Sequence, residues 1–484
     1  MDSNKRNITI ALMVAMFMGA IEGTVVTTAI PTIVKDLSGF GLISWVFSAY
    51  FLTSSVSTPI YGKLADVFGR KNVLFIGIGI FLVGSCLCGL SQNMHQLIAF
   101  RALQGLGAGS IFTVTYTIVG DIFTLADRAK VQGWLNAVWG IASVIGPFVG
   151  GFLIDVLSWH WVFFINVPFG ILCIILLQKY FQEEGEKKRP SIDYAGILVL
   201  SVAIITLLLG VPSGGKQALL SLAFMCILLL IFYYIEKNAR EPVIPFAILT
   251  RNNTVINLIS FLAAAVLIGA DVYMPVYIQN ILSYSPTISG LAMAPMSVSW
   301  LLSAFILARA IPEYGERTVT GAAMLVLLLG TLPLLLLGIK SPLIIVIIST
   351  FIMGFGFGGC FTTMTIAIQA SVDYNQRGAV TGLNSLVRSL GQTIAIGIFG
   401  GVFNRNIVNY FVSQGITGVD PNTLYSLPAG LKISLQNVAI AVNSALHIIF
   451  KLFIIITLVC LLLSILLPSN LKEKDSDQGK ANKL

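Results

Sequence analysis

Four charged side chains stand inside long apolar stretches of this 484-residue chain: Glu22, Arg101, Asp271 and Arg388. An ionisable group at the centre of a bilayer costs about 2.5–3.5 kcal/mol on insertion scales, so such groups commonly line cavities or relay protons. Glu22 lies roughly 21 Å along its apolar run, and Asp271 lies roughly 25 Å along another. The two carboxyl groups therefore predict reversible proton binding, with Glu22 as the principal candidate.

Each of these residues also has a structural interpretation. Glu22 could be a neutral acid hydrogen-bonded between helices, and Asp271 could be solvated near the outer end of its helix. Arg101 could form a structural ion pair or clamp a backbone carbonyl. We expect Arg388 to serve packing or gating rather than substrate contact.

Enzymatic chemistry has little support in the sequence. The chain has three histidines, at positions 95, 160 and 447, and no cluster of an acid with a histidine. Its six cysteines fall inside apolar runs without metal-site spacing, and it has no nucleotide-binding Gly-x-x-x-x-Gly-Lys-Ser/Thr loop. We expect no catalytic residue, no metal and no cofactor, and keep a membrane-embedded lipid enzyme as a remote alternative.

The composition predicts an all-α integral membrane protein. Apolar residues make up 56% of the chain, charged residues 10%, and the mean hydropathy is +0.90. Soluble domains carry about 25% charged residues. Hydropathy predicts fourteen transmembrane helices, at 8–34, 42–64, 73–91, 94–119, 130–156, 161–180, 193–211, 218–235, 254–281, 288–310, 318–338, 342–370, 378–403 and 446–468.

The positive charges predict the orientation of these helices. An even number of spans places both termini on one side of the membrane. Most of the 29 Lys and Arg residues fall in the segments on that side, and cytoplasmic segments are enriched in such residues. We therefore expect both termini in the cytoplasm and the chain in the cytoplasmic membrane. The net charge of +8 then reflects topology and not a nucleic-acid partner.

Internal repetition predicts two six-helix halves. Arg128 and Gly133 recur 249 residues later as Arg377 and Gly382, and the glycine run that starts at Gly105 recurs at the same separation. Two inserted helices remain between the halves, as in transporters built from repeats. The expected domains are 1–181, the insertion with its connectors at 182–252, 253–470 with an outer loop at 404–445, and a cytoplasmic tail at 471–484.

A short charged segment between the second and third apolar runs carries a family resemblance. Its pattern Gly-x-Leu-Ala-Asp-x-x-Gly-Arg-Lys contains Gly62, Asp66, Gly69 and Arg70. We expect a charged hairpin at the bilayer surface. The pattern resembles the signature loop of the major facilitator superfamily, and a degraded copy follows at 308–317. The resemblance implies that Asp66 and Arg70 hold the cytoplasmic side closed in the outward-facing state.

Further motifs narrow this resemblance. The fifth apolar run resembles the antiporter signature of drug exporters, although ordinary glycine packing remains an alternative. The fourth run, with Arg101 and Gln104, is similar to a second family motif, and the segment from Trp159 to Pro168 also looks family-like. The run from Glu22 to Pro31 resembles the first span of the fourteen-span drug–proton antiporters. The antiporter signature comprises Gly140, Gly146, Pro147, Gly150 and Gly151.

The resemblance implies a major facilitator fold and a proton-coupled antiporter, not an enzyme. Such a protein exports small amphipathic drugs or toxic compounds, chiefly cations, and confers antibiotic resistance. Glu22, Asp271, Arg101 and Gln104 are the expected proton and substrate residues. Glu22 stands where the family usually has Asp, and Asp271 where it usually has an uncharged residue. We expect a monomer driven by the proton motive force, and retain export of a lipid, peptide or metabolite as the alternative.

Overall fold

A computed structural model describes residues 3–123, 125–183, 193–213, 215–239, 249–372, 377–424 and 434–468. These residues form helices and no strand. The elements are α1 (Ser3–Leu37), η1 (Phe40–Leu42), α2 (Ile43–Phe68), α3 (Arg70–Gly89), α4 (Met94–Ile122), α5 (Leu125–Val156), α6 (Trp161–Phe164), α7 (Asn166–Tyr180), α8 (Tyr194–Ser213), α9 (Gly215–Asn238), α10 (Arg251–Val276), η3 (Tyr277–Ile281), α11 (Pro286–Thr331), η4 (Leu332–Leu336), α12 (Leu343–Ala370), α13 (Arg377–Ser413), η6 (Pro421–Thr423) and α14 (Leu435–Ser464).

Thirteen helices in the described ranges are long and apolar enough to cross a membrane, and Tyr194–Leu207 is a shorter apolar helix. Helices suit this environment because they satisfy their backbone hydrogen bonds internally. Several begin at a cap that the sequence supplies. For example, Ser285 accepts a hydrogen bond from the backbone of Ile288 and precedes Pro286 at the start of α11. The prediction of an all-α integral membrane fold is confirmed.

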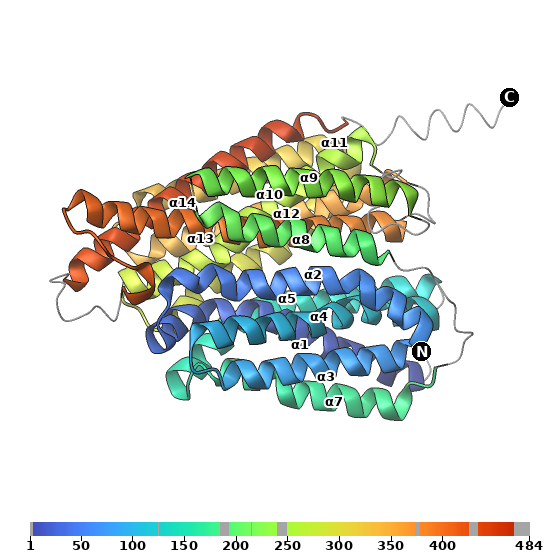
Figure 1. Ribbon diagram of the computed structural model, residues 1–484. Coiled ribbons are helices and arrows are strands. Elements are labelled where there is room, and N and C mark those ends of the chain that lie inside the picture. Colours follow the sequence, from blue (N-terminus) through green and yellow to red (C-terminus); the bar gives the residue numbers. More distant parts are fainter. Residues whose placement is uncertain are drawn as a thin grey trace.

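The helices form two bundles, which lie one above the other in Figure 1. The first bundle contains α1–α7, and the second contains α10–α14. Helices α8 and α9 pack against each other, and α8 also packs against α13 and touches α2, so it bridges the two bundles. The arrangement is that of the major facilitator fold with two added central helices.

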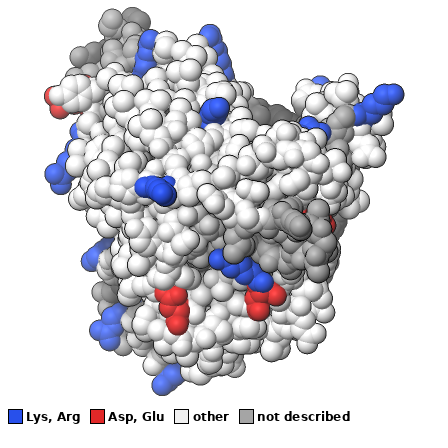
Figure 2. Space-filling model, turned by 90° about the vertical axis from the view of Figure 1, so that its left-hand side faces the viewer, with Lys and Arg blue, Asp and Glu red and all other residues white. Residues whose placement is uncertain are grey.

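The two bundles meet at the end of the molecule that carries η1 and η6, here called the η1 end. Asn404 Nδ2 on α13 donates a 2.8 Å hydrogen bond to the carbonyl of Gly41, and Phe40 contacts Phe403 with ring centroids 5.7 Å apart. Gln279 Nε2 of η3 donates to the carbonyl of Thr28 on α1 at 2.9 Å. Figure 2 looks onto this end, where charged side chains are few and scattered.

Helices α5 and α11 extend the contact from the η1 end to the middle of the bundles. Thr287 at the start of α11 donates its backbone N–H to Asp155 at 3.1 Å, and Ser297 Oγ donates to the carbonyl of Ser143 at 2.7 Å. The opposite end holds Ser3 and Gly69 and is here called the terminal end. Hydrogen bonds between the bundles therefore fasten the η1 side of the molecule.

The segment that resembles the signature loop is more helical than expected. Gly62 to Phe68 complete α2, and α3 starts at Arg70, so Gly69 alone breaks the helix, with φ 95°. A positive φ is accessible to glycine at little cost because it has no Cβ. The expected hairpin is thus a one-residue turn. Its degraded copy turns in the same way, at Gly315 with φ 78° inside α11.

Helix ends differ from expectation around the proposed outer loop. Helix α13 continues to Ser413 and α14 begins at Leu435, so the interruption is shorter than 404–445. Ile407 and Phe411 explain the extension, because they lie one turn apart and are both buried. The parts of the expected connectors at 184–192 and 240–248, and the tail at 471–484, lie outside the described residues.

Candidate functional site

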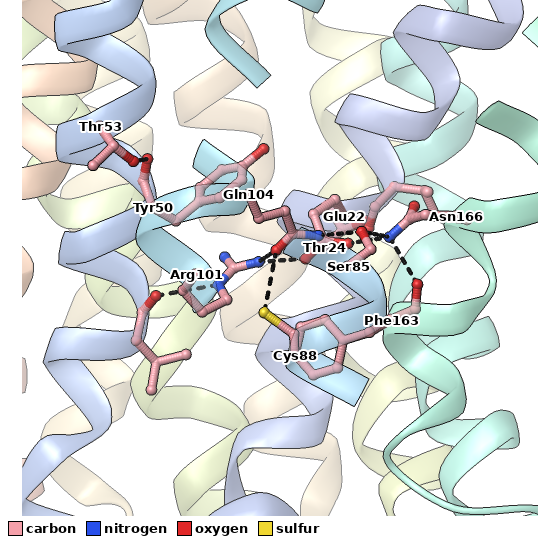
Figure 3. A network of polar contacts seen from close by, with 12 residues as sticks. Glu22, Thr24, Tyr50, Thr53, Ser85, Cys88, Arg101, Gln104, Phe163 and Asn166 are labelled. Carbon is pink, nitrogen blue, oxygen red and sulfur yellow. Dashed lines mark hydrogen bonds and ion pairs between the residues drawn. The ribbon is translucent and has the colours of Figure 1, made fainter. Parts of the chain in front are cut away.

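Glu22 forms a buried ion pair with Arg101 in the first bundle (Figure 3). Arg101 Nη1 on α4 contacts Glu22 Oε1 on α1, and Asn166 Nδ2 on α7 donates to Glu22 Oε2 at 2.5 Å. Both side chains of the pair are closed off from solvent, with 1% and 0% of their surface exposed. A buried charge is tolerated when a partner and hydrogen bonds compensate it, and Glu22 has both.

Three further contacts surround the guanidinium of Arg101. Its Nη1 also donates to Gln104 Oε1 at 2.6 Å, and its Nε donates to the carbonyl of Val46 at 3.3 Å. The guanidinium carbon lies 4.2 Å from the ring centroid of Tyr50. Gln104 Nε2 in turn donates to Ser85 Oγ at 2.7 Å. Five helices, α1, α2, α3, α4 and α7, thus converge on one charge pair.

The structure brings together three of the predicted site residues, Glu22, Arg101 and Gln104. Sequence reasoning missed Ser85, Tyr50 and the role of Asn166. Asn166 carried a signal, since a polar amide in an apolar span needs a partner, but its partner comes from 144 positions earlier in the chain. Glu22 is buried, and its partners Arg101 and Asn166 both belong to the first bundle.

Asp271 lies apart from this network, on α10 of the second bundle. Its side chain is partly exposed, although its neighbours Ala270 and Val272 are buried. No described residue gives its carboxylate a hydrogen bond or an ion pair. It stands two helical turns before Gln279, the residue that contacts α1. Asp271 therefore presents an uncompensated carboxylate close to the junction of the bundles.

Arg388 on α13 is the second uncompensated charge. Its Nη2 donates to the carbonyl of Phe361 at 3.2 Å and to Thr365 Oγ1 at 2.8 Å, both on α12. The guanidinium carbon lies 4.7 Å from the ring centroid of Phe361. Its Nε is buried without a partner, and no acid among the described residues pairs with it. Arg388 therefore carries a net positive charge into the second bundle.

The residues of the signature segment form a charged cluster at the terminal end. Arg70 pairs with Asp66 and with Asp121, both at 2.8 Å. Its backbone N–H donates to Glu183 at 2.6 Å. These partners lie on α2, on α4 and just after α7, all in the first bundle. Among the described residues, Asp66 and Arg70 have no ion pair with the second bundle, so the closing contact that the resemblance implies is not seen here.

The antiporter-like glycines let α5 approach two other helices. A Cβ on Gly146 would collide with Thr24 of α1, and one on Gly150 would lie 2.8 Å from the carbonyl of Val25. Toward α11, a Cβ on Gly151 would lie 2.6 Å from the backbone of Thr287, and one on Gly140 would lie 2.7 Å from Leu301. Pro147 contacts Gly290 of α11 in the same way. Helix α5 thus links α1 of the first bundle to the second bundle.

Comparisons with known proteins agree with this arrangement. A sequence profile of the Major Facilitator Superfamily matches residues 12–396. The chain is 36% identical over 435 residues to the multidrug transporter protein MdtP of Bacillus subtilis, covering 88% of this chain and 80% of that protein. It is 32% identical to the multidrug efflux pump SdrM of Staphylococcus aureus, covering 88% and 94%.

Solved structures support the fold alone. A bacterial homolog of the human lysosomal transporter Spinster, in an inward-facing and occupied conformation, superposes with a TM-score of 0.72. The match covers 96% of this chain and 97% of the other, at 13% sequence identity. Such low identity carries no information about cargo.

Proposed function

The chain belongs to the Major Facilitator Superfamily of transporters, and from that membership we propose that it is a proton-coupled antiporter that exports small amphipathic compounds. The named functions of its bacterial relatives support multidrug efflux. The buried Glu22–Arg101 pair carries the proposal of proton coupling. A single proton bound to Glu22 would neutralise its carboxylate and break the ion pair. Protonation would leave Arg101 without its counterion in a low-dielectric core.

Helix α5 supplies a path from this pair to the second bundle. Thr24 lies two residues after Glu22, and its Oγ1 reaches the carbonyl of Ala142 on α5 at 3.3 Å. Gly146 and Gly151 let α5 fit closely against α1 on one side and α11 on the other. A rearrangement of α1 on proton binding would therefore displace packed backbones at the bundle junction. Closely packed interfaces tend to switch between discrete arrangements and do not deform continuously.

Asp271 is the proposed contact for a cationic substrate. Its side chain is partly exposed and no described residue pairs with it, whereas Glu22 is buried and paired. Cation binding there would satisfy a charge that costs free energy in an apolar span. If Asp271 also accepts a proton, two protons could enter for each monovalent cation exported. That exchange would move net charge and respond to the membrane potential.

We propose that the terminal end faces the cytoplasm. The cationic segments of the sequence gather there, as the bias of cytoplasmic loops toward Lys and Arg requires. Since the bundles are fastened at the η1 end, the structure corresponds to a state that is closed to the outside. In that state Asp66 and Arg70 lie free of the second bundle. Their proposed gate contact belongs to the opposite state.

Transport driven by an imposed pH gradient tests this function. Inverted membrane vesicles or proteoliposomes with the wild-type chain should take up a lipophilic cation such as tetraphenylphosphonium when a pH gradient is imposed. Glu22→Gln mimics the neutral acid and should abolish this uptake, while Glu22→Asp should keep part of it. The Gln variant should still insert, because an amide is less costly at depth than a carboxylate. Undiminished uptake by Glu22→Gln would refute the proton-coupling role.

A further inference from the structure

Arg388 is a cation in a membrane-spanning helix with neutral partners only. Phe361 O and Thr365 Oγ1, the two acceptors that it reaches, are already joined by a 2.8 Å hydrogen bond inside α12. A guanidinium has five N–H donors, and only those on Nη2 have a partner among the described residues. The buried Nε has none. The side chain as a whole remains partly exposed, so part of the guanidinium faces open space.

Asp271 cannot neutralise this charge. Gly391, three residues after Arg388, packs on the backbone of Phe261 in α10. Phe261 precedes Asp271 by ten residues, which is about 15 Å along a helix. The polar neighbours one turn before Arg388 are neutral as well. Asn384 donates to Asn257 Oδ1 at 2.9 Å, and Asn257 Nδ2 is a further buried donor without a partner.

Three aromatic rings pack together beside Arg388. Phe361, which lies under the guanidinium, is stacked on Trp300 of α11 with centroids 5.2 Å apart and an interplanar angle of 19°. Phe357 continues the stack at 6.3 Å and 15° from Phe361. Phe357 and Phe361 are buried, whereas Trp300 is partly exposed, so Trp300 is the ring of this stack that a ligand can reach.

Trp300 faces away from the lipid side of α11. The exposed residues Val298, Leu302 and Phe305 mark that side. At 100° per residue, Trp300 lies roughly opposite their mean direction, and it is itself partly exposed. Its partly exposed ring therefore lies on the side of α11 that is turned away from lipid.

We propose that Arg388 and the Trp300–Phe361 stack form a binding site for the carboxylate of a flat aromatic compound. The ring of the ligand would lie against Trp300, and its carboxylate would accept hydrogen bonds from the free N–H groups of Arg388. This inference rests on the proposed function and deepens it. It extends the cargo to aromatic acids and to compounds that carry both a carboxylate and a cation.

The oxyanion could also come from the phosphate of an anionic lipid. The flat ring stack and the inward direction of Trp300 favour an aromatic ligand, because acyl chains gain nothing from stacking geometry. Arg101 provides the internal contrast. It also lies over a ring, that of Tyr50, but its charge is already neutralised by Glu22, which contacts Nη1.

Equilibrium binding to the purified protein tests the site without requiring transport. The probes are 2-naphthoate, its uncharged methyl ester, and tetraphenylphosphonium as a cationic control, each measured in nanodiscs of zwitterionic lipid. Arg388→Gln should weaken naphthoate binding by about tenfold or more, the loss expected for a charge-assisted hydrogen bond. Binding of the ester and of tetraphenylphosphonium should change by less than about threefold, since neither gains from a guanidinium.

Further variants separate charge from stacking. Arg388→Lys should recover part of the naphthoate affinity, and Thr365→Val, which removes a neutral partner and keeps the charge, should leave it nearly intact. Trp300→Leu should weaken the acid and the ester alike. Retained tetraphenylphosphonium binding in each variant shows that the fold is preserved.

Two outcomes would overturn the proposal. Equal loss of acid and ester in Arg388→Gln would make Arg388 a packing residue. Failure of naphthoate to bind, together with Arg388-dependent binding of phosphatidylglycerol, would make the site a lipid site. Either result would leave pH-driven cation uptake intact, whereas failure of the proposed function would abolish that uptake in the wild-type chain.

Discussion

The two bundles of this transporter differ in whether the charged side chains inside their helices are paired. In the first, Glu22 and Arg101 neutralise each other inside a network that five helices hold in place. In the second, Asp271 and Arg388 lie far apart, and no described residue of opposite charge pairs with either. A paired charge can act as an internal switch, because its partner senses its protonation. A partly exposed charge without such a partner is suited to a ligand that arrives from outside.

Breaking the pair in the first bundle should have the largest effect. Arg101→Met leaves Glu22 buried without a counterion, a change that typically costs about 3–5 kcal/mol. We expect a clearly lower unfolding temperature in detergent and no transport. The double variant Glu22→Gln with Arg101→Met removes both charges and should regain stability but not pH-driven uptake. An unfolding temperature for Arg101→Met equal to wild type would show that the pair does not stabilise the bundle.

The packing of α5 between the bundles should be the next most sensitive feature. Gly151→Ala places a methyl group against the backbone of Pro286 and Thr287, where neither partner can yield easily. Transport should fall at least about tenfold if the close approach is part of the conformational cycle. Gly133→Ala is the matched control on the same helix, since a Cβ there meets nothing within 4 Å. Equal transport by Gly151→Ala and Gly133→Ala would show that the glycines of the antiporter-like motif serve only ordinary helix packing.

The cluster at the terminal end should give the smallest effect on stability. Asp66 and Arg70 are 31% and 20% exposed, and exposed ion pairs contribute about 0–1 kcal/mol. Asp66→Asn should therefore leave the unfolding temperature nearly unchanged, while transport at equal expression falls because the opposite state loses its gate contact. Wild-type transport by Asp66→Asn would exclude Asp66 from the gate.

Much of the fold could be read from the sequence because the bilayer imposes a simple rule. Apolar runs of sufficient length must become helices, and the repeat at 249 residues identified the two bundles. Helix ends outside the apolar region were harder to predict, because burial of residues such as Ile407 and Phe411 determines them, and not contact with lipid. The turn at Gly69 looked like a loop because a charged, glycine-rich pattern does not tell a helix end from a hairpin.

The site was predictable in its residues and not in its connections. Glu22, Arg101, Asp271 and Arg388 stood out because charge is rare in such segments. Hydropathy cannot tell which of them meet, because that depends on how α1, α4 and α7 rotate about their axes. The first two form a pair and the other two have no acidic or basic partner. That contrast changes the interpretation of Arg388, which we expected to be a packing or gating residue.

Binding of tetraphenylphosphonium to Glu22→Gln and Asp271→Asn tests the division between the bundles most directly. The affinity of the purified variants would be compared with wild type at one pH. Asp271→Asn should weaken binding by about tenfold or more, because it removes the partly exposed carboxylate that would meet the cation. The affinity of Glu22→Gln for the cation should stay within about threefold of the wild-type value, since the carboxylate of Glu22 is already paired with Arg101. The opposite order, with Glu22→Gln losing the cation and Asp271→Asn retaining it, would contradict the account.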